Sequence, residues 1–176
     1  MQFHHLDPEH VSLFVSRSFP FDQHVDRFSP QIMVAEQMGL VRLVTWRSQT
    51  PFITLNAGMS PLSFAHWNPA DQMRFVAVAD GKWLLWNLSR RGVRVSFPEK
   101  TGDAHADGSR LFRWSLVDSD IFATTSSRNL LKVCNSQRAH LPQPFPQRNR
   151  VADFSWQAGS SWVVATADCF LKFISV

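Results

Sequence analysis

Histidine and carboxylate side chains crowd the first ten residues of the chain, where they could in principle hold a metal ion. They are His4, His5, Asp7, Glu9 and His10. Imidazole and carboxylate groups are common ligands of zinc, but this spacing matches neither a closed structural site nor a catalytic one. We therefore expect no metal and no other cofactor.

A second group has the residue types of a hydrolytic triad. Ser160 or Ser161 would supply the nucleophile, with His140 and Asp153 as the base and the orienting acid. However, the serines are not set in the G-x-S-x-G turn that exposes such a nucleophile in one large class of hydrolases. The sequence therefore gives no support for a triad.

A third group lies in the segment TGDAHADG, where Asp103, His105 and Asp107 are spaced by two residues. Glycine and alanine surround them, as is typical of a loop on a protein surface. We predict a solvated loop between two structural units. Since none of the three groups forms a catalytic set, we predict no catalytic residues and a protein that is not an enzyme.

Two cysteines and seven tryptophans complete the inventory of reactive or ligand-binding side chains. Cys134 and Cys169 lie far apart, without C-x-x-C or His/Cys spacing, so neither a zinc site nor a disulfide framework is expected. The tryptophans could stack on a ligand, but most of them occupy the repeated positions described below. We therefore assign them to the core.

The composition favours a packed, aromatic-rich interior, with 44% apolar residues and 15 Phe but no Tyr. No apolar run approaches the ~20 residues that span a bilayer. The amino terminus lacks the basic and apolar regions of a secretory signal, so we expect a soluble intracellular protein. The net charge of +4 is spread along the chain, with short clusters at Arg90, Arg91 and Arg94 and at Arg148 and Arg150. This spread does not favour direct binding of nucleic acid.

Four segments align without gaps, and each has the period-2 alternation of a strand with one buried face. They are residues 39–45 (GLVRLVT), 81–87 (GKWLLWN), 129–135 (NLLKVCN) and 169–175 (CFLKFIS). Apolar residues hold the third and fifth positions: Val41 and Leu43, Trp83 and Leu85, Leu131 and Val133, Leu171 and Phe173. The sixth position is held by Val44, Trp86, Cys134 and Ile174. It recurs about every 40 to 48 residues, close to the period of a WD-type propeller blade.

An aromatic residue stands roughly 16 to 20 residues before each sixth position. These anchors are Phe28, Trp67, Trp114 and Trp156. Each is followed by a short run of small and branched residues, at 32–35, 75–79, 121–125 and 162–166. We read each unit as an aromatic-ended strand, a small-residue strand, a tight turn and a third strand. In the second unit Asp80 and Gly81 form that turn, because this dipeptide favours a two-residue hairpin.

Connecting segments are expected to supply the outer strands. Residues 51–56, 93–97 (VRVSF) and 137–150 (QRAHLPQPFPQRNR) are the candidates. The last is restricted to an edge or a loop by Pro142, Pro144 and Pro146. The segment SLFVS, residues 12–16, is expected to be the outer strand that opens the first unit. The interruption of all four units by Pro or Gly, and the lack of a 3.6-residue stripe, exclude a helical fold.

The prediction is therefore an all-β, WD40-type β-propeller of about four blades, in the form of an open arc. It forms one partial domain over residues 1–176, with units at about 1–46, 47–88, 89–135 and 136–176.

Residues 58–90 (GMSPLSFAHWNPADQMRFVAVADGKWLLWNLSR), 111–127 (LFRWSLVDSDIFATTSS) and 32–39 (IMVAEQMG) also resemble a known family. They are similar to the carboxy-terminal half of the thirty-seven-kilodalton WD-repeat nucleoporins, and the resemblance runs from about Phe28 to Val176. Propellers of that family have seven blades, so the resemblance implies a chain that lacks the earlier ones. The alternative is a ring closed with four blades.

The resemblance implies a non-enzymatic scaffold subunit of the Y-shaped complex of the nuclear pore. Its partners would be a large propeller-solenoid nucleoporin and other subunits of that complex, and it would support pore assembly and the transport of protein and mRNA. It further implies a location in the nuclear envelope, and at kinetochores in dividing animal cells. Residues 90–109 and 137–150 are the candidate contact segments, because long loops on a fixed scaffold commonly carry recognition.

Two other functions are compatible with the composition. One is a generic WD-repeat adaptor in another nuclear or ubiquitin-ligase complex. The other is a small β-domain that binds nucleic acid through exposed tryptophan and arginine, with an affinity that falls steeply as salt rises.

Overall fold

The structure is a computed structural model of the whole chain, and it describes residues 11–17, 31–45, 51–71, 73–89, 96–138, 141–167 and 170–176. For residues 11–17 and residue 31 it describes the backbone alone. All regular elements in these ranges are β-strands. None of the described segments is a helix with the length and apolar character needed to cross a membrane.

The strands form four antiparallel sheets in which neighbours along the chain are neighbours in space. The first sheet contains β1 (Val11–Arg17), β2 (Gln31–Glu36), β3 (Leu40–Thr45) and β4 (Pro51–Asn56). The second sheet contains β5 (Leu62–Trp67), β6 (Arg74–Ala79), β7 (Lys82–Asn87) and β8 (Lys100–Asp103). The third sheet contains β9 (Ser109–Trp114), β10 (Ile121–Ser126), β11 (Leu130–Asn135) and β12 (Gln143–Pro146). The fourth sheet contains β13 (Asp153–Trp156), β14 (Trp162–Ala167) and β15 (Phe170–Ser175), and no further described strand pairs with β15.

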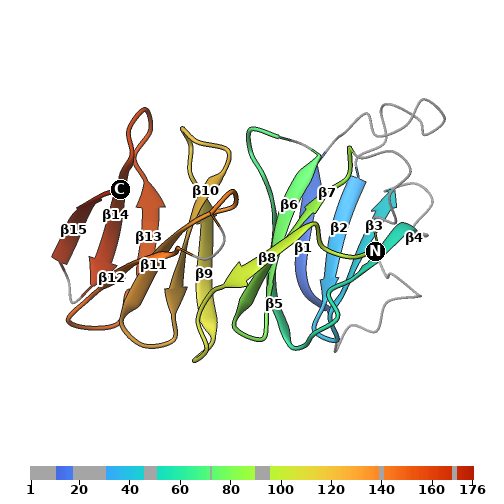
Figure 1. Ribbon diagram of the computed structural model, residues 1–176, viewed down its shortest axis with the longest axis horizontal. Helices are drawn as coiled ribbons and strands as arrows, with labels where there is room; N and C mark the ends of the chain where they lie inside the picture. Colours follow the sequence, from blue (N-terminus) through green and yellow to red (C-terminus); the bar gives the residue numbers. More distant parts are fainter. Residues whose placement is uncertain are drawn as a thin grey trace.

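The sheets stand side by side in one row, with the first and the fourth at opposite ends (Figure 1). The first strands of neighbouring sheets approach one another, β1 beside β5, β5 beside β9 and β9 beside β13. The described chain is therefore a partial WD40-like propeller, an open arc of four blades, which confirms the predicted fold class.

The repeated positions of the sequence are equivalent in space. Val44, Trp86, Cys134 and Ile174 are each the fifth residue of a third strand. They pair with equivalent residues of the second strands, namely Ile32, Phe75, Phe122 and Val163. The hairpin predicted at Asp80 and Gly81 is also present: Ala79 pairs with Lys82, and both turn residues have positive φ.

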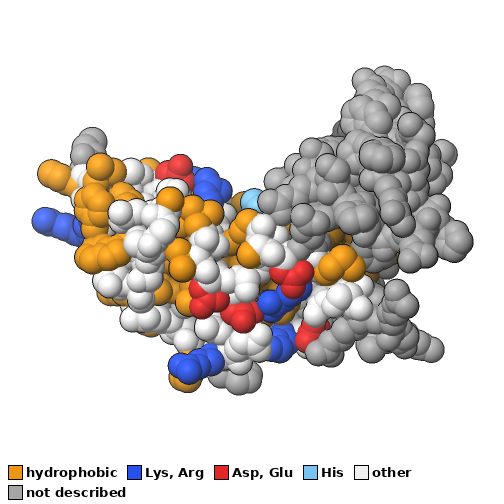
Figure 2. Space-filling model, turned by 90° about the horizontal axis from the view of Figure 1, so that it is seen from above, with side chains coloured by type: hydrophobic (Ala, Val, Ile, Leu, Met, Phe, Trp, Pro, Cys, Tyr) orange, Lys and Arg blue, Asp and Glu red, His pale blue; other side chains and the backbone are white. Residues whose placement is uncertain are grey.

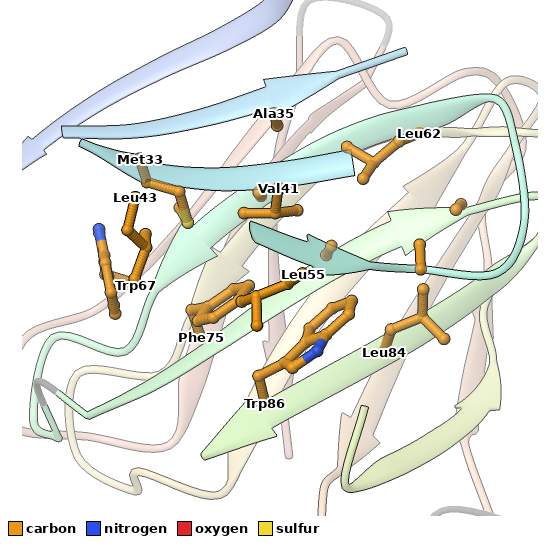
Figure 3. Close-up of a cluster of buried hydrophobic side chains, with 14 of the residues drawn as sticks. Met33, Ala35, Val41, Leu43, Leu55, Leu62, Trp67, Phe75, Leu84 and Trp86 are labelled. Atoms are coloured by element: carbon orange, nitrogen blue, oxygen red, sulfur yellow. The ribbon is translucent and has the colours of Figure 1, made fainter. Parts of the chain in front are cut away.

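The core is divided into clusters that lie between consecutive sheets. Figure 3 shows the first cluster, where side chains of β2, β3 and β4 meet those of β5, β6 and β7. Trp86 is fully buried here and stacks on Phe75, with ring centroids 5.0 Å apart. A second cluster joins the second and third sheets, and another joins the third and fourth. Each sheet is thus held mainly by the sheet that follows it, because the apolar faces are buried between sheets.

Two strand predictions are wrong. The segment SLFVS lies in β1, which pairs with β2. This is the position that β5 has beside β6 in the second sheet, so β1 is the first strand of its sheet and not an outer one. The register places Ser16 opposite Ile32, as Trp67 stands opposite Phe75. Ser16 therefore takes the position that we gave to Phe28, which lies outside the described residues.

The outer strand of the second sheet is β8 and not residues 93–97. Ser96 and Phe97 lie in a turn before β8, and residues 93–95 are outside the described ranges. The other two outer strands are confirmed, since β4 pairs with β3 and β12 pairs with β11. Pro144 and Pro146 fit in β12 because it is an edge strand with no further neighbour in the sheet.

Candidate protein-docking surface

The tryptophans that end β9 and β13 tie the third and fourth sheets to the sheets before them. The indole Nε1 of Trp114 donates to the carbonyl oxygen of His66 at 3.3 Å. In the next sheet, Nε1 of Trp156 donates to the carbonyl oxygen of Arg113 at 3.1 Å. His66 and Arg113 each directly precede the tryptophan of their own sheet, so the contact repeats along the arc. Both indoles are buried, which confirms that these tryptophans belong to the core.

His66 lies between the second and third sheets. Its imidazole stacks on Phe112, with ring centroids 5.2 Å apart and an interplanar angle of 14°. Burial lowers the pKa of His66 to about 4, and the nearby positive charge of Arg113 adds to the lowering. The ring is therefore neutral at physiological pH and acts as an aromatic spacer between the sheets.

His105 makes a second contact between these sheets. It is buried in the connection between β8 and β9, and its Nε2 lies 3.0 Å from Oγ1 of Thr124 in β10. The Nζ of Lys132 donates to the carbonyl oxygen of Ala104 in the same connection. Burial lowers the pKa of His105 and Lys132 adds to this, while Thr124 and Asp107 act in the opposite direction.

These contacts correct the prediction of a solvated loop at Asp103, His105 and Asp107. Asp103 ends strand β8, and only Asp103 and Asp107 are exposed. The segment does connect two sheets, but His105 points inward because Thr124 offers a hydrogen-bonding partner in the next sheet. Sequence analysis could not find this partner, since 19 residues separate the two.

A polar network crosses the second and third sheets at the start of β6 and β10. Oδ1 of Asp120 accepts from Nη2 of Arg74 at 2.8 Å, from Oγ of Ser136 at 2.7 Å and from Nε2 of Gln137 at 3.1 Å. Burial raises the pKa of Asp120, but the hydrogen bonds from Ser136 and Arg74 and the Arg74 charge outweigh it, so the pKa is lowered. Each of these residues lies at or next to the end of a strand. The network therefore links the second sheet, through Arg74, to the third.

Cys134 is a core residue and not a nucleophile. It is buried in the cluster between the second and third sheets. Burial raises the pKa of its thiol to about 12, although Lys132 and Thr124 act in the opposite direction. A thiol with such a pKa is protonated at neutral pH and unreactive, as its place in the repeat predicted. Cys169 lies outside the described residues.

The remaining candidates form no site among the residues that the structure describes. The amino-terminal group of His4, His5, Asp7, Glu9 and His10 lies outside the described ranges, as does His140. Ser160 follows β13, and Asp153 begins it, so the two stand at opposite ends of that strand. Within the described residues, no cluster of His, Cys, Asp and Glu has an arrangement that could hold a metal ion.

The outward face of the fourth sheet carries exposed apolar side chains. Leu171 and Phe173 of β15 and Trp162 of β14 are exposed there. Residues that pair across antiparallel strands point to the same face of the sheet. Leu171 pairs with Thr166, Phe173 with Val164 and Ser175 with Trp162, so all three exposed side chains lie on one face. Figure 2 shows hydrophobic side chains gathered at this end of the molecule. No strand or sheet among the described residues covers this face.

Comparison with known proteins shows which proteins the chain is similar to. The chain is 35% identical to mouse nucleoporin Nup37 over 95 residues, 54% of its length. It is 33% identical to human nucleoporin Nup37 over 116 residues, 66% of its length.

The chain is similar to part of nucleoporin Nup37. This confirms the resemblance found in the sequence motifs. The matches span 28% of mouse Nup37 and 34% of human Nup37, so the chain corresponds to about a third of these relatives. No protein-family model matches the chain.

Proposed function

We propose that this chain is a nucleoporin that acts as a structural subunit of the nuclear pore, without enzymatic activity. The observation that carries the proposal is the identity of 33–35% to two Nup37 proteins over more than half of the chain. The rigid stack of sheets supports it, since tryptophan hydrogen bonds and polar networks hold the blades together and leave surfaces for association.

More specifically, the subunit belongs to the Y-shaped scaffold complex and docks on its large propeller-solenoid nucleoporin. Through that complex it supports pore assembly and the transport of protein and mRNA, and in dividing animal cells it is also present at kinetochores. Residues 90–109 and 137–150, which contain the outer strands β8 and β12, are the proposed contact segments. The units at about 1–46, 47–88, 89–135 and 136–176 are the proposed sequence repeats of the propeller.

The test is the location and company of the protein in cells. A fluorescently tagged chain expressed in human cells is expected at the nuclear rim, and affinity purification followed by mass spectrometry is expected to recover other nuclear pore proteins. The matched control is the tagged Trp86→Ala variant, which loses a fully buried side chain of the core. It should lose both the rim signal and the partners.

Other outcomes would contradict the proposal. A folded wild-type chain that stays diffuse and recovers subunits of a ubiquitin ligase would favour the adaptor function. Binding of a single-stranded oligonucleotide that weakens strongly between low and physiological salt would favour the nucleic-acid-binding function. The scaffold function predicts no such binding.

A further inference from the structure

Strand β12, the outer strand of the third sheet, has proline at alternate positions. Pro144 and Pro146 lie in the strand, and Pro142 directly precedes it. Among the described residues β12 pairs with β11 alone, so its other edge faces away from the sheet. An unpaired edge normally presents a row of backbone N–H and C=O groups on which another strand can pair.

The hydrogen bonds show which backbone groups of β12 point towards β11. The N–H of Gln147, directly after the strand, donates to the carbonyl oxygen of Asn129 at 2.7 Å. In an antiparallel pair, alternate residues of an edge strand point their N–H and C=O groups towards the neighbour. Residues 143, 145 and 147 therefore use these groups in the ladder with β11, and residues 142, 144 and 146 turn theirs to the outer edge.

All three outward positions are proline, which has no N–H and whose ring fills the space of the missing hydrogen. A strand that approached this edge would find acceptors but no donors. Its own carbonyl groups would lose their bonds to water without a replacement, which is costly. The inward positions, Gln143 and Phe145, are not proline, since proline there would remove a bond to β11.

The outer strands of the first two sheets lack this arrangement. Ala57 and Ala104, the residues directly after β4 and β8, each donate to the residue before the third strand of their own sheet. The same alternation turns the N–H groups of Thr54 in β4 and Thr101 in β8 to the outer edge. The missing donors of β12 are therefore not demanded by the repeated architecture of the sheets.

The segment around β12 is also apolar and accessible. Leu141 is 75% exposed and Phe145 is half-buried. Exposed apolar edge strands are sites of unwanted pairing between molecules, and proline is one of the residues that prevent it. The prolines thus stand where an unprotected edge would be most prone to pair.

We propose that Pro142, Pro144 and Pro146 form an edge block, which prevents a strand of another molecule, including a second copy of this chain, from adding to the third sheet. The edge block goes beyond the proposed function, because it concerns a surface that is closed to backbone pairing whichever proteins the chain binds elsewhere.

The test restores the donors in the full chain. The triple variant Pro142→Thr, Pro144→Thr and Pro146→Thr gains three outward N–H groups and keeps the ladder with β11. In sedimentation velocity it should associate at a concentration at least about tenfold lower than the wild type, because two or more new backbone hydrogen bonds can form between molecules. Hydrogen exchange of the associated form should show protection over residues 142–146 that dilution removes.

Two further variants separate the edge block from other effects of proline. Pro69→Thr is the matched control, because Pro69 is an exposed proline in the connection between β5 and β6. It should associate as the wild type does. Gln143→Pro removes an inward donor, so it should lower the midpoint of urea unfolding clearly more than Pro144→Thr, which leaves the ladder intact.

Several results would overturn the proposal. The folded triple variant associates no more readily than the wild type, Pro69→Thr associates as readily as the triple variant, or the protection falls outside residues 142–146. If the triple variant does not fold, the single Pro144→Thr variant is measured in the same way. Loss of folding in Pro144→Thr would also contradict the edge block, because it would mean that position 144 faces β11. None of these measurements involves a nuclear pore protein, so the proposed function is tested separately.

Discussion

The third strands of the third and fourth sheets have nearly the same sequence pattern and very different surroundings. In β11, Leu131 and Val133 are 0% and 6% exposed. In β15, Leu171 and Phe173 hold the equivalent positions and are 63% and 62% exposed. The difference arises because β11 is followed by a fourth strand and a further sheet, and β15 by neither among the described residues.

This comparison shows that burial in the arc is a property of the neighbouring sheet. The period-2 pattern decides which face of a strand is apolar, but it does not decide whether that face is covered. Burial of a large apolar side chain contributes roughly 1.5–3 kcal/mol to the free energy of unfolding, and an exposed side chain contributes little of this. The same pattern therefore builds a core between the third and fourth sheets, whereas its apolar side chains on the outer side of the fourth are exposed among the described residues.

The largest effect is expected for Trp86→Ala, which empties a covered position. The indole is fully buried and stacks on Phe75, so the variant should lose about 3–5 kcal/mol of unfolding free energy in a urea titration. Ile174→Ala, at the same position of the partly exposed β15, is the matched variant and should lose clearly less. Equal losses at the two positions would contradict the comparison.

The direct test compares two leucines at one position of the repeat. Leu131→Ala should cost about 2–5 kcal/mol of unfolding free energy because it leaves a cavity between the third and fourth sheets. Leu171→Ala should change the unfolding free energy by no more than about 0.5 kcal/mol, since the side chain is exposed. A large loss for Leu171→Ala would mean that the outward face is already covered.

The sequence predicts the elements that repeat a local pattern. The second and third strands of every sheet lie where small-residue runs and period-2 segments indicated, and the Asp80-Gly81 turn was recognisable from two residues. Cys134 was placed in the core by its position in the repeat, and the structure confirms it. These features depend on neighbours a few residues apart, so one sequence carries enough information.

The missed features depend on partners far along the chain. In the first sheet Ser16 replaces the tryptophan of the first strand, so the aromatic signal is lost and Phe28 was chosen instead. Strand β8, KTGD, has no β-prone pattern, because Gly102 must fit beside the Trp83 indole. Arg74 and Asp120 form an ion pair across 46 residues, and no local motif marks either of them.

Gly102→Ala tests how tightly the outer strand β8 packs on β7. The new methyl group would overlap the Trp83 indole, so the variant should lose about 1–3 kcal/mol of unfolding free energy. Thr101→Ala is the matched control, because Thr101 is exposed in the same strand. A neutral Gly102→Ala would mean that β8 shifts freely beside Trp83.

Acid should loosen the covered interface between the second and third sheets. Both His66 and His105 have a lowered pKa in the folded chain, so folding favours their neutral forms. Their contribution is complete above the unfolded pKa of about 6.5 and is lost as the pH falls below it. For His66 the loss continues towards pH 4.

Urea titrations over this range should show a falling midpoint in the wild type and a shallower fall in His66→Gln. This variant keeps a polar side chain of similar size but cannot titrate. An identical pH dependence in wild type and His66→Gln would show that the imidazole is not held neutral by the interface.

The smallest effect is expected for the hydrogen bonds that repeat along the arc. Trp156→Phe keeps most of the buried ring but removes the donor to the carbonyl of Arg113, so the unfolding free energy should fall by about 0.5–1.5 kcal/mol plus a small packing term. Trp114→Phe removes the equivalent bond to His66 and should give a similar loss. A much larger loss for Trp114→Phe would mean that the interface between the second and third sheets depends on its indole hydrogen bond more than the interface between the third and fourth sheets does. Similar values would show that one contact is reused at successive interfaces between sheets.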